Sequence, residues 1–330
     1  MKKLAFILGS AFLVACGSGE NKTTESTGDE QNTQATASEE YVIEPAAVEK
    51  HLAFLASDEM QGRNTGSEQI AKAADYIADQ FKLVGIKPYF ETYRDDFDAK
   101  GTAAFNVVGV LPGNDPELKD EYVIVGAHYD HIGTAKEVDG DTIANGANDN
   151  ASGTTTVIEL AKHFAAAKTN KRSIIFALFS AEEKGLLGSA HLAEKLKAEN
   201  LDLYVMFNIE MVGVPMLDKE YLMYITGYEM SNLADVFNGY CGKDVIGFLP
   251  QAKEFNLFNR SDNAPFYAQF DVAAQTVSTF DFTNFDHYHG ADDEADKMDP
   301  VHMANVANSL IPGLDGLVNS QEKTVMINVQ

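Results

Sequence analysis

Histidine and carboxylate side chains follow the apolar runs of this chain at one place after another. The run YVIV, residues 122–125, leads into GAHYDHIG, residues 126–133, which carries His128 and Asp130. Groups of the same kind stand further along: Asp149 in GANDNASG, Glu182 and Glu183 after SIIFALFS, Glu210 after LYVMFNI, and His287, Tyr288 and His289 in FDHYHGADDE. Strand ends of this kind are expected to meet at one edge of a sheet. So many carboxylates at one place would repel one another unless a multivalent cation neutralised them. Imidazole combined with carboxylate suits zinc better than magnesium or calcium, which prefer shells of oxygen.

Strands and helices alternate along the part of the chain that carries these groups. Strands are expected at 122–127, 173–180 and 203–209, and helices at 154–167 and 185–196. Upstream, a helix is expected over 45–56, and Thr65 with Glu68 is predicted to cap a helical run that ends at Gly85. This order predicts a largely parallel, helix-covered α/β sheet whose ligands gather at the carboxyl ends of the strands.

The composition excludes one class of partner. The chain has 330 residues, of which 45% are hydrophobic, so it is long enough to bury a sizeable core. Lys and Arg number 25 against 50 Asp and Glu, which gives a formal net charge of −25. Such a charge repels phosphate backbones, and nucleic acid is therefore not an expected partner.

The N-terminus has the features of a targeting segment. Residues 1–15 combine two lysines with an apolar stretch too short to span a bilayer, and LVAC resembles the lipobox of bacterial lipoproteins. Cleavage would leave Cys16 as a lipidated N-terminus, anchored to a membrane of the bacterial cell envelope. Residues 16–40 are poor in large apolar side chains and are expected to form a disordered tether. A single folded domain is expected over 41–330, with Cys241 as its one remaining cysteine.

Several of the polar residues have structural explanations as well. Ser180 and Glu183 could form a capping box for the next helix, and Asp149 could cap the helix that starts near Ser152. His131 and His287 are left out of the metal set. The coincidence of metal-type groups at four successive strand or loop ends nevertheless favours a metal site.

Six motifs carry a resemblance to a known family. They are GAHYDHIG, GANDNASG, SAEEKGLLGS, FNIEM, RSDNAPF and YHGADDE, in this order, preceded by the lead-in LASDEMQGRNTGSEQIAKAADYIADQFKLVGIKP. Together they resemble the co-catalytic zinc aminopeptidases, a family that includes bacterial leucyl aminopeptidases, glutamate carboxypeptidase, glutaminyl cyclase and the non-enzymatic transferrin receptor. The resemblance covers roughly residues 46–320. It implies a three-layer α/β sandwich around a central mixed, mostly parallel sheet, as a single catalytic domain.

The resemblance also implies a ligand set for two zinc ions per chain. Asp149 would bridge the two metals, which lie about 3.5–4 Å apart in hydrolases of this kind. His128 and Glu210 would complete one site, and Glu183 and His289 the other. Many relatives have aspartate where this chain has Glu210, and the extra methylene changes the reach of that ligand.

Four further residues receive roles beside the metals. Asp130 would hold the second ring nitrogen of His128, and Asp293 would do the same for His289. Glu182 would move the proton from the attacking water to the leaving amine. Tyr288 would donate a hydrogen bond to the developing oxyanion.

The predicted function is that of a lipid-anchored zinc exopeptidase, an aminopeptidase that releases N-terminal residues from peptide substrates. A carboxypeptidase is the alternative within the same chemistry, with Arg260 as the receptor of a substrate carboxylate. A one-metal cyclase is disfavoured because the chain has no tryptophan, whereas the resemblance to the cyclases implies a pocket that relies on it. A receptor-like binding module that has lost its metals is disfavoured by the intact ligand set. Side-chain specificity and oligomeric state stay open.

Overall fold

The computed structural model describes residues 41–328. The predicted signal segment, the lipidation site Cys16 and the tether lie outside the described residues. Within residues 41–328, no helix is both long enough and apolar enough to cross a lipid bilayer.

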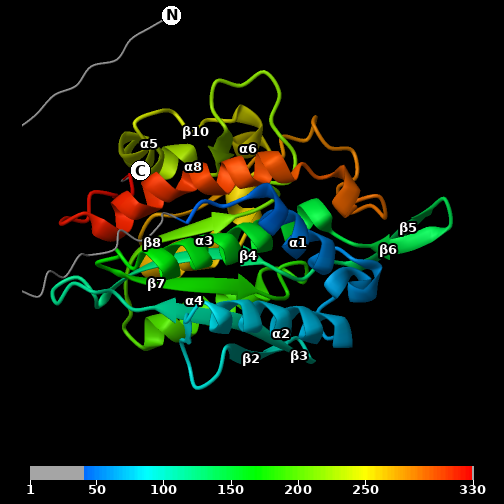
Figure 1. Cartoon of the computed structure of the whole chain (residues 1–330), viewed down its shortest axis with the longest axis horizontal. Helices are drawn as coiled ribbons and strands as arrows, with labels where there is room; N and C mark the ends of the chain where they lie inside the picture. Colours follow the sequence, from blue (N-terminus) through cyan, green and yellow to red (C-terminus); the bar gives the residue numbers. More distant parts are fainter. Residues whose placement is uncertain (1–40, 329–330) are drawn as a thin grey trace, which may run out of the picture. The chain divides into compact units, whose positions relative to one another are not determined.

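A nine-stranded mixed sheet forms the centre of the fold (Figure 1). Its strands are β1 (Lys87–Pro88), β2 (Arg94–Ala99), β3 (Thr102–Leu111), β4 (Glu121–His128), β7 (Ser173–Phe179), β8 (Asp202–Ile209), β9 (Met223–Ile225), β10 (Ile246–Gly247) and β11 (Ala274–Ser278). They are ordered β1-β3-β7-β4-β8-β11-β9-β10, with β2 paired to β3. The central strands β7, β4, β8 and β11 are parallel, and β3 and β9 join this block antiparallel. Strands β5 (Gly133–Val138) and β6 (Asp141–Ala144) form a separate hairpin that projects from the body of the domain.

Helices cover both faces of the sheet. They are α1 (Pro45–Leu55), α2 (Glu68–Leu83), α3 (Gly153–Ala167), α4 (Leu187–Ala198), α5 (Leu233–Cys241), α6 (Pro250–Glu254), α7 (Asn263–Phe270) and α8 (Pro300–Asn319). Short helical turns, η1 (Asp58–Arg63), η2 (Ala147–Ser152), η3 (Tyr228–Met230), η4 (Leu257–Arg260) and η5 (Ala295–Lys297), lie in the connections. Helix α8 packs on α1, α3 and α5, whereas α4 packs on α7.

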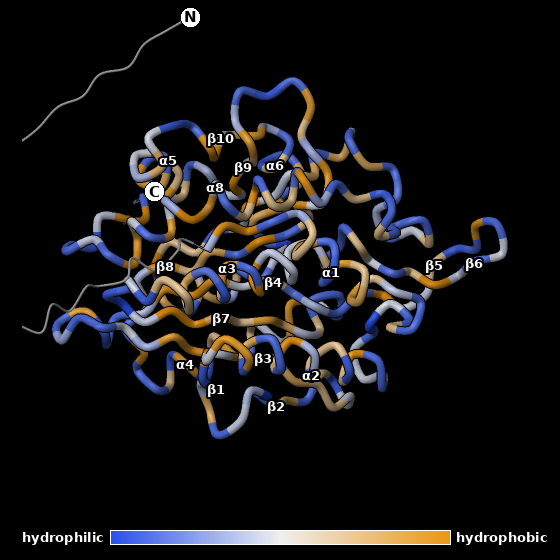
Figure 2. The backbone as a smooth tube through the Cα atoms, viewed as in Figure 1, coloured by the Kyte–Doolittle hydropathy of each residue, from blue (hydrophilic) through white to orange (hydrophobic). Residues whose placement is uncertain are grey.

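Alternating side chains of the buried strands build the two cores. Ile174 and Phe176 of β7 join the core beneath α1, α3 and α8, and Ile175 and Phe179 join the core beneath α4 and α7. Every residue of β7 is buried, as expected for a parallel strand covered on both faces. Figure 2 shows β4, β7 and β8 as mostly hydrophobic stretches between hydrophilic loops. The predicted three-layer α/β fold is therefore confirmed.

One predicted helix cap is wrong. Helix α2 begins at Glu68, and its N-cap is Ser67, whose hydroxyl accepts a hydrogen bond from the backbone nitrogen of Ile70 at 3.2 Å. Thr65 instead donates to Asp130 Oδ2 at 2.9 Å and accepts from the backbone nitrogen of Ala181. The T-x-x-E pattern placed the cap two residues too early because this hydroxyl is used in a long-range contact.

Candidate metal centre

The parallel strands bring most of the predicted site residues to one edge of the sheet. His128 is the last residue of β4, Glu182 and Glu183 follow β7, and Glu210 follows β8. Strand β4 lies between β7 and β8 and is parallel to both, so their carboxyl ends meet. Asp149 comes from η2, ahead of α3.

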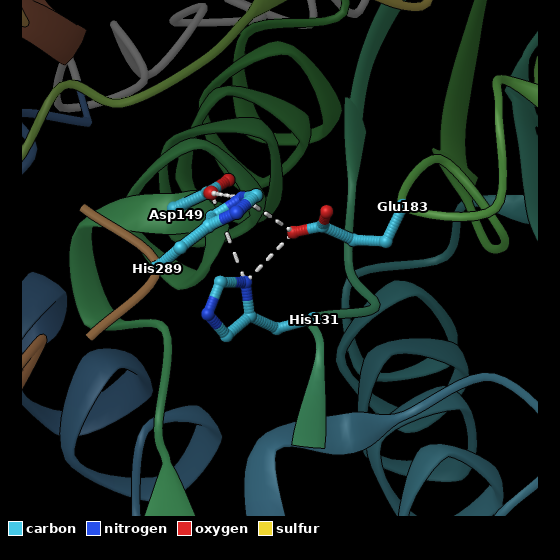
Figure 3. Close-up of side chains that lie close together, drawn as sticks. All are labelled: His131, Asp149, Glu183 and His289. Carbon is cyan, nitrogen blue, oxygen red and sulfur yellow. Dashed lines mark hydrogen bonds and ion pairs between the residues drawn. The ribbon is translucent and has the colours of Figure 1, made fainter. Parts of the chain in front are cut away.

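Four side chains converge at this edge (Figure 3). His131, Asp149, Glu183 and His289 each offer one ligand atom, and these atoms all lie within 4.8 Å of one another. Glu183 Oε1 is 2.9 Å from His131 Nδ1 and 3.4 Å from His289 Nε2. The close-up shows the four side chains pointing toward a common centre from different segments.

The two oxygens of Asp149 face different histidines. Oδ1 is 3.3 Å from His128 Nε2, whereas Oδ2 is 3.1 Å from His289 Nε2. The side chain of Asp149 therefore stands between two groups of potential ligands, one on the His128 side and one on the His289 side.

Glu210 lies on the His128 side and is held by hydroxyl groups. Its carboxylate accepts a hydrogen bond from Ser261 Oγ. Asn208 Nδ2 and Thr276 Oγ1 each donate to that same Ser261 hydroxyl at 2.9 Å. The longer glutamate side chain is thus anchored by a neighbouring segment of the chain, at the start of α7.

Negative charge dominates the electrostatics of the site. Burial alone would lower the pKa of His128, but the carboxylates of Glu182 and Asp149 raise it well above its ordinary value. Burial likewise acts to lower the pKa of His289, whereas its contacts with Asp149 and Glu183 raise it to about 10. Burial raises the pKa of Glu182 well above its ordinary range, and the charges of Asp262 and Glu210 add to this effect.

This arrangement fits zinc. The donor atoms are imidazole nitrogens and carboxylate oxygens, which zinc binds at about 2.0–2.2 Å. His128 Nε2 is buried without a hydrogen-bond partner among residues 41–328, and it points at Asp149. The raised pKa values of the two histidines come from these same carboxylates, and a cation bound between them would offset this negative charge.

The predicted orienting roles of two aspartates are wrong in detail. His128 Nδ1 is 3.1 Å from the backbone oxygen of Asp130 and 3.9 Å from its carboxylate, so the carbonyl is the acceptor. The Asp130 carboxylate accepts instead from Thr65 Oγ1 and from the backbone nitrogen of Glu182. Asp293 accepts from the backbone nitrogens of Asn148 and Asp149 at 2.7 and 3.1 Å and holds the loop of the bridging residue rather than His289.

The alternative capping roles are not found. Helix α4 begins at Leu187, beyond the SAEE segment, and Ser180 Oγ has no hydrogen-bond partner in the described part of the chain. The N-cap of helix α3 is Ser152, which makes no side-chain capping bond, and the backbone nitrogen of Gly153 donates to Asn150 Oδ1 at 2.9 Å rather than to Asp149. Both carboxylates that these explanations would have used are free to face the site.

Tyr288 and Arg260 line a cleft beside Glu210, with a volume of about 40 Å³. Apolar walls are provided by Leu257, Phe280 and Phe282. The Tyr288 ring stacks on His289, with ring centroids 4.0 Å apart. Arg260 is exposed and forms no ion pair with any residue that the structure describes.

The structure separates the two histidines that were left out of the ligand set. His287 lies outside the converging group and faces Asp292 at 3.8 Å. His131 is fully buried and stands inside the group. His131 was left out of the predicted ligand set, and its place three residues after His128 in GAHYDHIG is the signal that could have included it.

Comparisons with known proteins agree with this geometry. The sequence pattern described as peptidase family M28 matches residues 106–312. A protein named "Probable zinc metalloprotease" from Pyrenophora teres f. teres is 41% identical over 107 residues, which are 32% of this chain and 22% of that protein. A protein named "Probable leucine aminopeptidase" from Trichophyton verrucosum is 27% identical over 256 residues, 75% of this chain and 67% of that protein. The chain thus spans only about a fifth of the first of these relatives.

A solved structure shows the same fold. A zinc aminopeptidase from Bacillus subtilis superposes with a TM-score of 0.67 at 15% identity, over 85% of this chain and 96% of that one. The resemblance seen in the sequence motifs is confirmed by the family pattern, which covers more than half of the chain. The chain belongs to peptidase family M28.

Proposed function

We propose that this protein is a zinc-dependent exopeptidase, and specifically an aminopeptidase that releases N-terminal residues from peptides. One observation carries the proposal: imidazole and carboxylate groups from distant segments converge within 4.8 Å, next to the half-buried acid Glu182. Membership of a peptidase family supports hydrolysis of peptide bonds as the reaction.

The proposal assigns two zinc ions to each chain. His128 and Glu210 would hold one ion, Glu183 and His289 the other, and Asp149 would bind both. The orientation of the Asp149 oxygens, one toward His128 and one toward His289, supports a bridging role. When bound, zinc in such a centre supplies Lewis-acid polarisation of the scissile carbonyl and acidifies the attacking water.

Glu182 is assigned the proton transfer. Its carboxylate takes the proton of the attacking water and passes it to the nitrogen of the leaving group. Burial raises its pKa, which brings a carboxyl group closer to the range in which it can both accept and return a proton. The turn that carries it is fixed by the hydrogen bond from its backbone nitrogen to Asp130 Oδ1 at 3.1 Å.

Tyr288 is assigned as a hydrogen-bond donor to the developing oxyanion. Burial raises the pKa of its phenol, and the negative charges of Asp149 and Glu210 raise it further. The hydroxyl therefore keeps its proton at neutral pH and is able to donate it in a hydrogen bond.

The charge around the site favours a free N-terminus over a C-terminus. The carboxylates of Glu182 and Glu210 create a negative field that attracts an α-ammonium group and repels a carboxylate. Arg260 is the positive group in the cleft beside Glu210, and it is the feature that favours a carboxypeptidase instead.

Blocked peptides distinguish these two activities. Acetylating the N-terminus of a good substrate should lower kcat/KM by at least about tenfold, which corresponds to about 1.4 kcal/mol, whereas amidating its C-terminus should have little effect. The reverse pattern, with Arg260→Ala as damaging as the amide, would reject the aminopeptidase in favour of the carboxypeptidase.

We also propose that the protein is attached to a membrane of the bacterial cell envelope through lipidated Cys16. The support lies in the sequence of residues 1–16. Labelling cells with a tagged fatty acid should mark the wild-type protein and leave Cys16→Ala unmarked and released from membranes. Equal membrane association of the two proteins would reject the anchor.

A further inference from the structure

His131 occupies a position that the assigned two-zinc ligand set does not explain. Its side chain is fully buried, and Nδ1 lies 2.9 Å from Glu183 Oε1 and 3.8 Å from Asp149 Oδ2 (Figure 3). The other ring nitrogen, Nε2, is buried and has no hydrogen-bond partner within residues 41–328. All polar contacts of this ring are therefore made by Nδ1, on the side that faces the two carboxylates.

Four of the six separations between the donor atoms lie near the ligand spacing of a tetrahedral zinc site, and all six are below 4.8 Å. Ligands held about 2.0–2.2 Å from a tetrahedral zinc ion lie about 3.3–3.6 Å from one another. Here the separations are 2.9 Å between His131 and Glu183, 3.1 Å between His289 and Asp149, 3.4 Å between His289 and Glu183, and 3.8 Å between His131 and Asp149. These four distances bracket the expected spacing, so small movements would complete the shell.

The protein backbone is shaped around this ring. Gly146 has a φ of +59° and lies so close that a Cβ atom there would be 2.5 Å from His131 Cγ. The carbonyl of Gly146 is held by Arg63 Nη2 at 2.9 Å. The left-handed conformation of Gly146 and the hydrogen bond from buried Arg63 therefore fix the backbone segment that packs against the His131 imidazole.

The two halves of the centre then differ in their number of protein ligands. On the other side of Asp149, the assigned ligands among residues 41–328 are His128 and Glu210, and Glu210 is also engaged by Ser261. Three protein ligands leave an open coordination position, which is the pattern of catalytic zinc, whereas four close the shell, which is the pattern of structural zinc.

We propose that His131 is a fourth protein ligand, through Nδ1, in the zinc site formed by Asp149, Glu183 and His289. This site is then closed and binds zinc tightly, while the site of His128, Asp149 and Glu210 keeps the open position and binds zinc more weakly. The inference rests on the proposed function for the identity of the metal and for the assignment of two zinc ions that share Asp149.

Zinc competition measures the difference between the sites. The full-length protein is loaded with zinc and dialysed against increasing concentrations of a chelator, and bound zinc is counted. Wild-type protein should lose one zinc ion early and keep the second. His131→Asn should lose the second ion at a chelator strength at least about 100-fold lower, because removing a ligand should cost more than removing a partner outside the metal shell, which costs about 10–100-fold.

Two comparisons separate ligation from a hydrogen bond to Glu183. Asparagine can still donate to the Glu183 carboxylate, so His131→Asn with wild-type affinity would mean that His131 only positions Glu183 and would overturn the proposal. The matched control is His287→Asn, a nearby histidine outside the group, which should keep the wild-type zinc profile.

If the His131→Asn variant fails to fold, spectroscopy of the wild-type protein tests whether His131 is a zinc ligand. X-ray absorption of protein that retains one zinc ion should show two imidazole ligands, and replacement by one equivalent of cobalt should give the intense visible bands of a tetrahedral ion. One imidazole and a weak, higher-coordinate cobalt spectrum would refute the role of His131 and leave the peptidase proposal standing. Wild-type protein that binds no zinc would refute both.

Discussion

Arg63 connects the two loops that carry the metal-facing side chains, and its replacement is expected to be strongly destabilising. Its side chain is fully buried. Nε donates to the carbonyl of Tyr129 at 2.9 Å, beside His128, and Nη1 and Nη2 donate to the carbonyls of Asn145 and Gly146 at 2.7 and 2.9 Å, ahead of Asp149. A further bond from Nη1 reaches the carbonyl of Leu55 at the end of α1.

The size of the effect follows from these four bonds. Burial lowers the pKa of Arg63 to about 10, so the guanidinium is still charged at neutral pH. Hydrogen bonds from a charged donor contribute about 1.5–3 kcal/mol each to stability. Replacing Arg63 by methionine removes the donor of four carbonyl groups and loses these contributions. Water can replace some of the bonds, so Arg63→Met should lower the free energy of unfolding by at least about 4 kcal/mol, a large part of the roughly 5–15 kcal/mol of a typical domain.

Urea unfolding of the full-length protein measures this loss. Arg63→Lys keeps the charge but offers its donors from a single nitrogen, which cannot reach both loops, so it should recover about half of the loss. The matched control is Arg94→Met, because Arg94 is partly exposed and its ion pair with Asp75 should contribute about 1 kcal/mol at most. An Arg63→Met protein within about 1 kcal/mol of wild type would refute the role of Arg63 as the link between the loops.

Two further predictions concern carboxylic acids: the pair Glu182 and Glu183 at the proposed zinc site, and Glu159 in the core. Glu182→Gln should keep the bound zinc and the fold while the hydrolysis rate falls by about 10²–10⁴, whereas Glu183→Gln should lose zinc; two active variants with full zinc content would contradict both assignments. Buried Glu159 accepts hydrogen bonds from His51, Lys162 and Tyr41, and although burial acts to raise its pKa, these partners lower it to about 2. Its contribution to stability, about 3 kcal/mol, is therefore complete above the unfolded-state pKa of about 4.5 and is lost as the pH falls toward 2. Glu159→Gln should unfold in less urea than wild type at pH 7 and in nearly equal urea at pH 2; parallel pH profiles would contradict this.

Most of the fold could be predicted because short-range sequence patterns indicate its strands and helices. The strand predicted at 173–180 is observed as Ser173–Phe179, and the helix predicted at 154–167 is observed as Gly153–Ala167. Continuous apolar runs and helical periodicity are short-range signals, and the alternation of strands with helices fixes a parallel arrangement. The convergence of strand ends then follows from topology alone, which is why Glu183 and Asp149 could be named from the sequence.

The parts that were missed depend on contacts between distant segments. The hydrogen bond between Ser261 and Glu210, and those between Arg63 and the carbonyls near residue 146, join positions far apart in the chain. No local pattern marks these partners. Thr65 was misassigned for the same reason, because its hydroxyl serves Asp130 instead of the adjacent helix. The place of His131 in the converging group depends on how the chain turns after β4, which an alternating strand pattern does not describe.

The central claim is that zinc held at this edge of the sheet is required for hydrolysis of peptides with a free N-terminus. The most direct measurement follows the activity of the purified protein on such a peptide while zinc is removed by a chelator and then returned in counted amounts. The account predicts that activity disappears with the metal and returns as bound zinc approaches two ions per chain, and that Asp149→Asn does not recover. Activity that is indifferent to the chelator would contradict it.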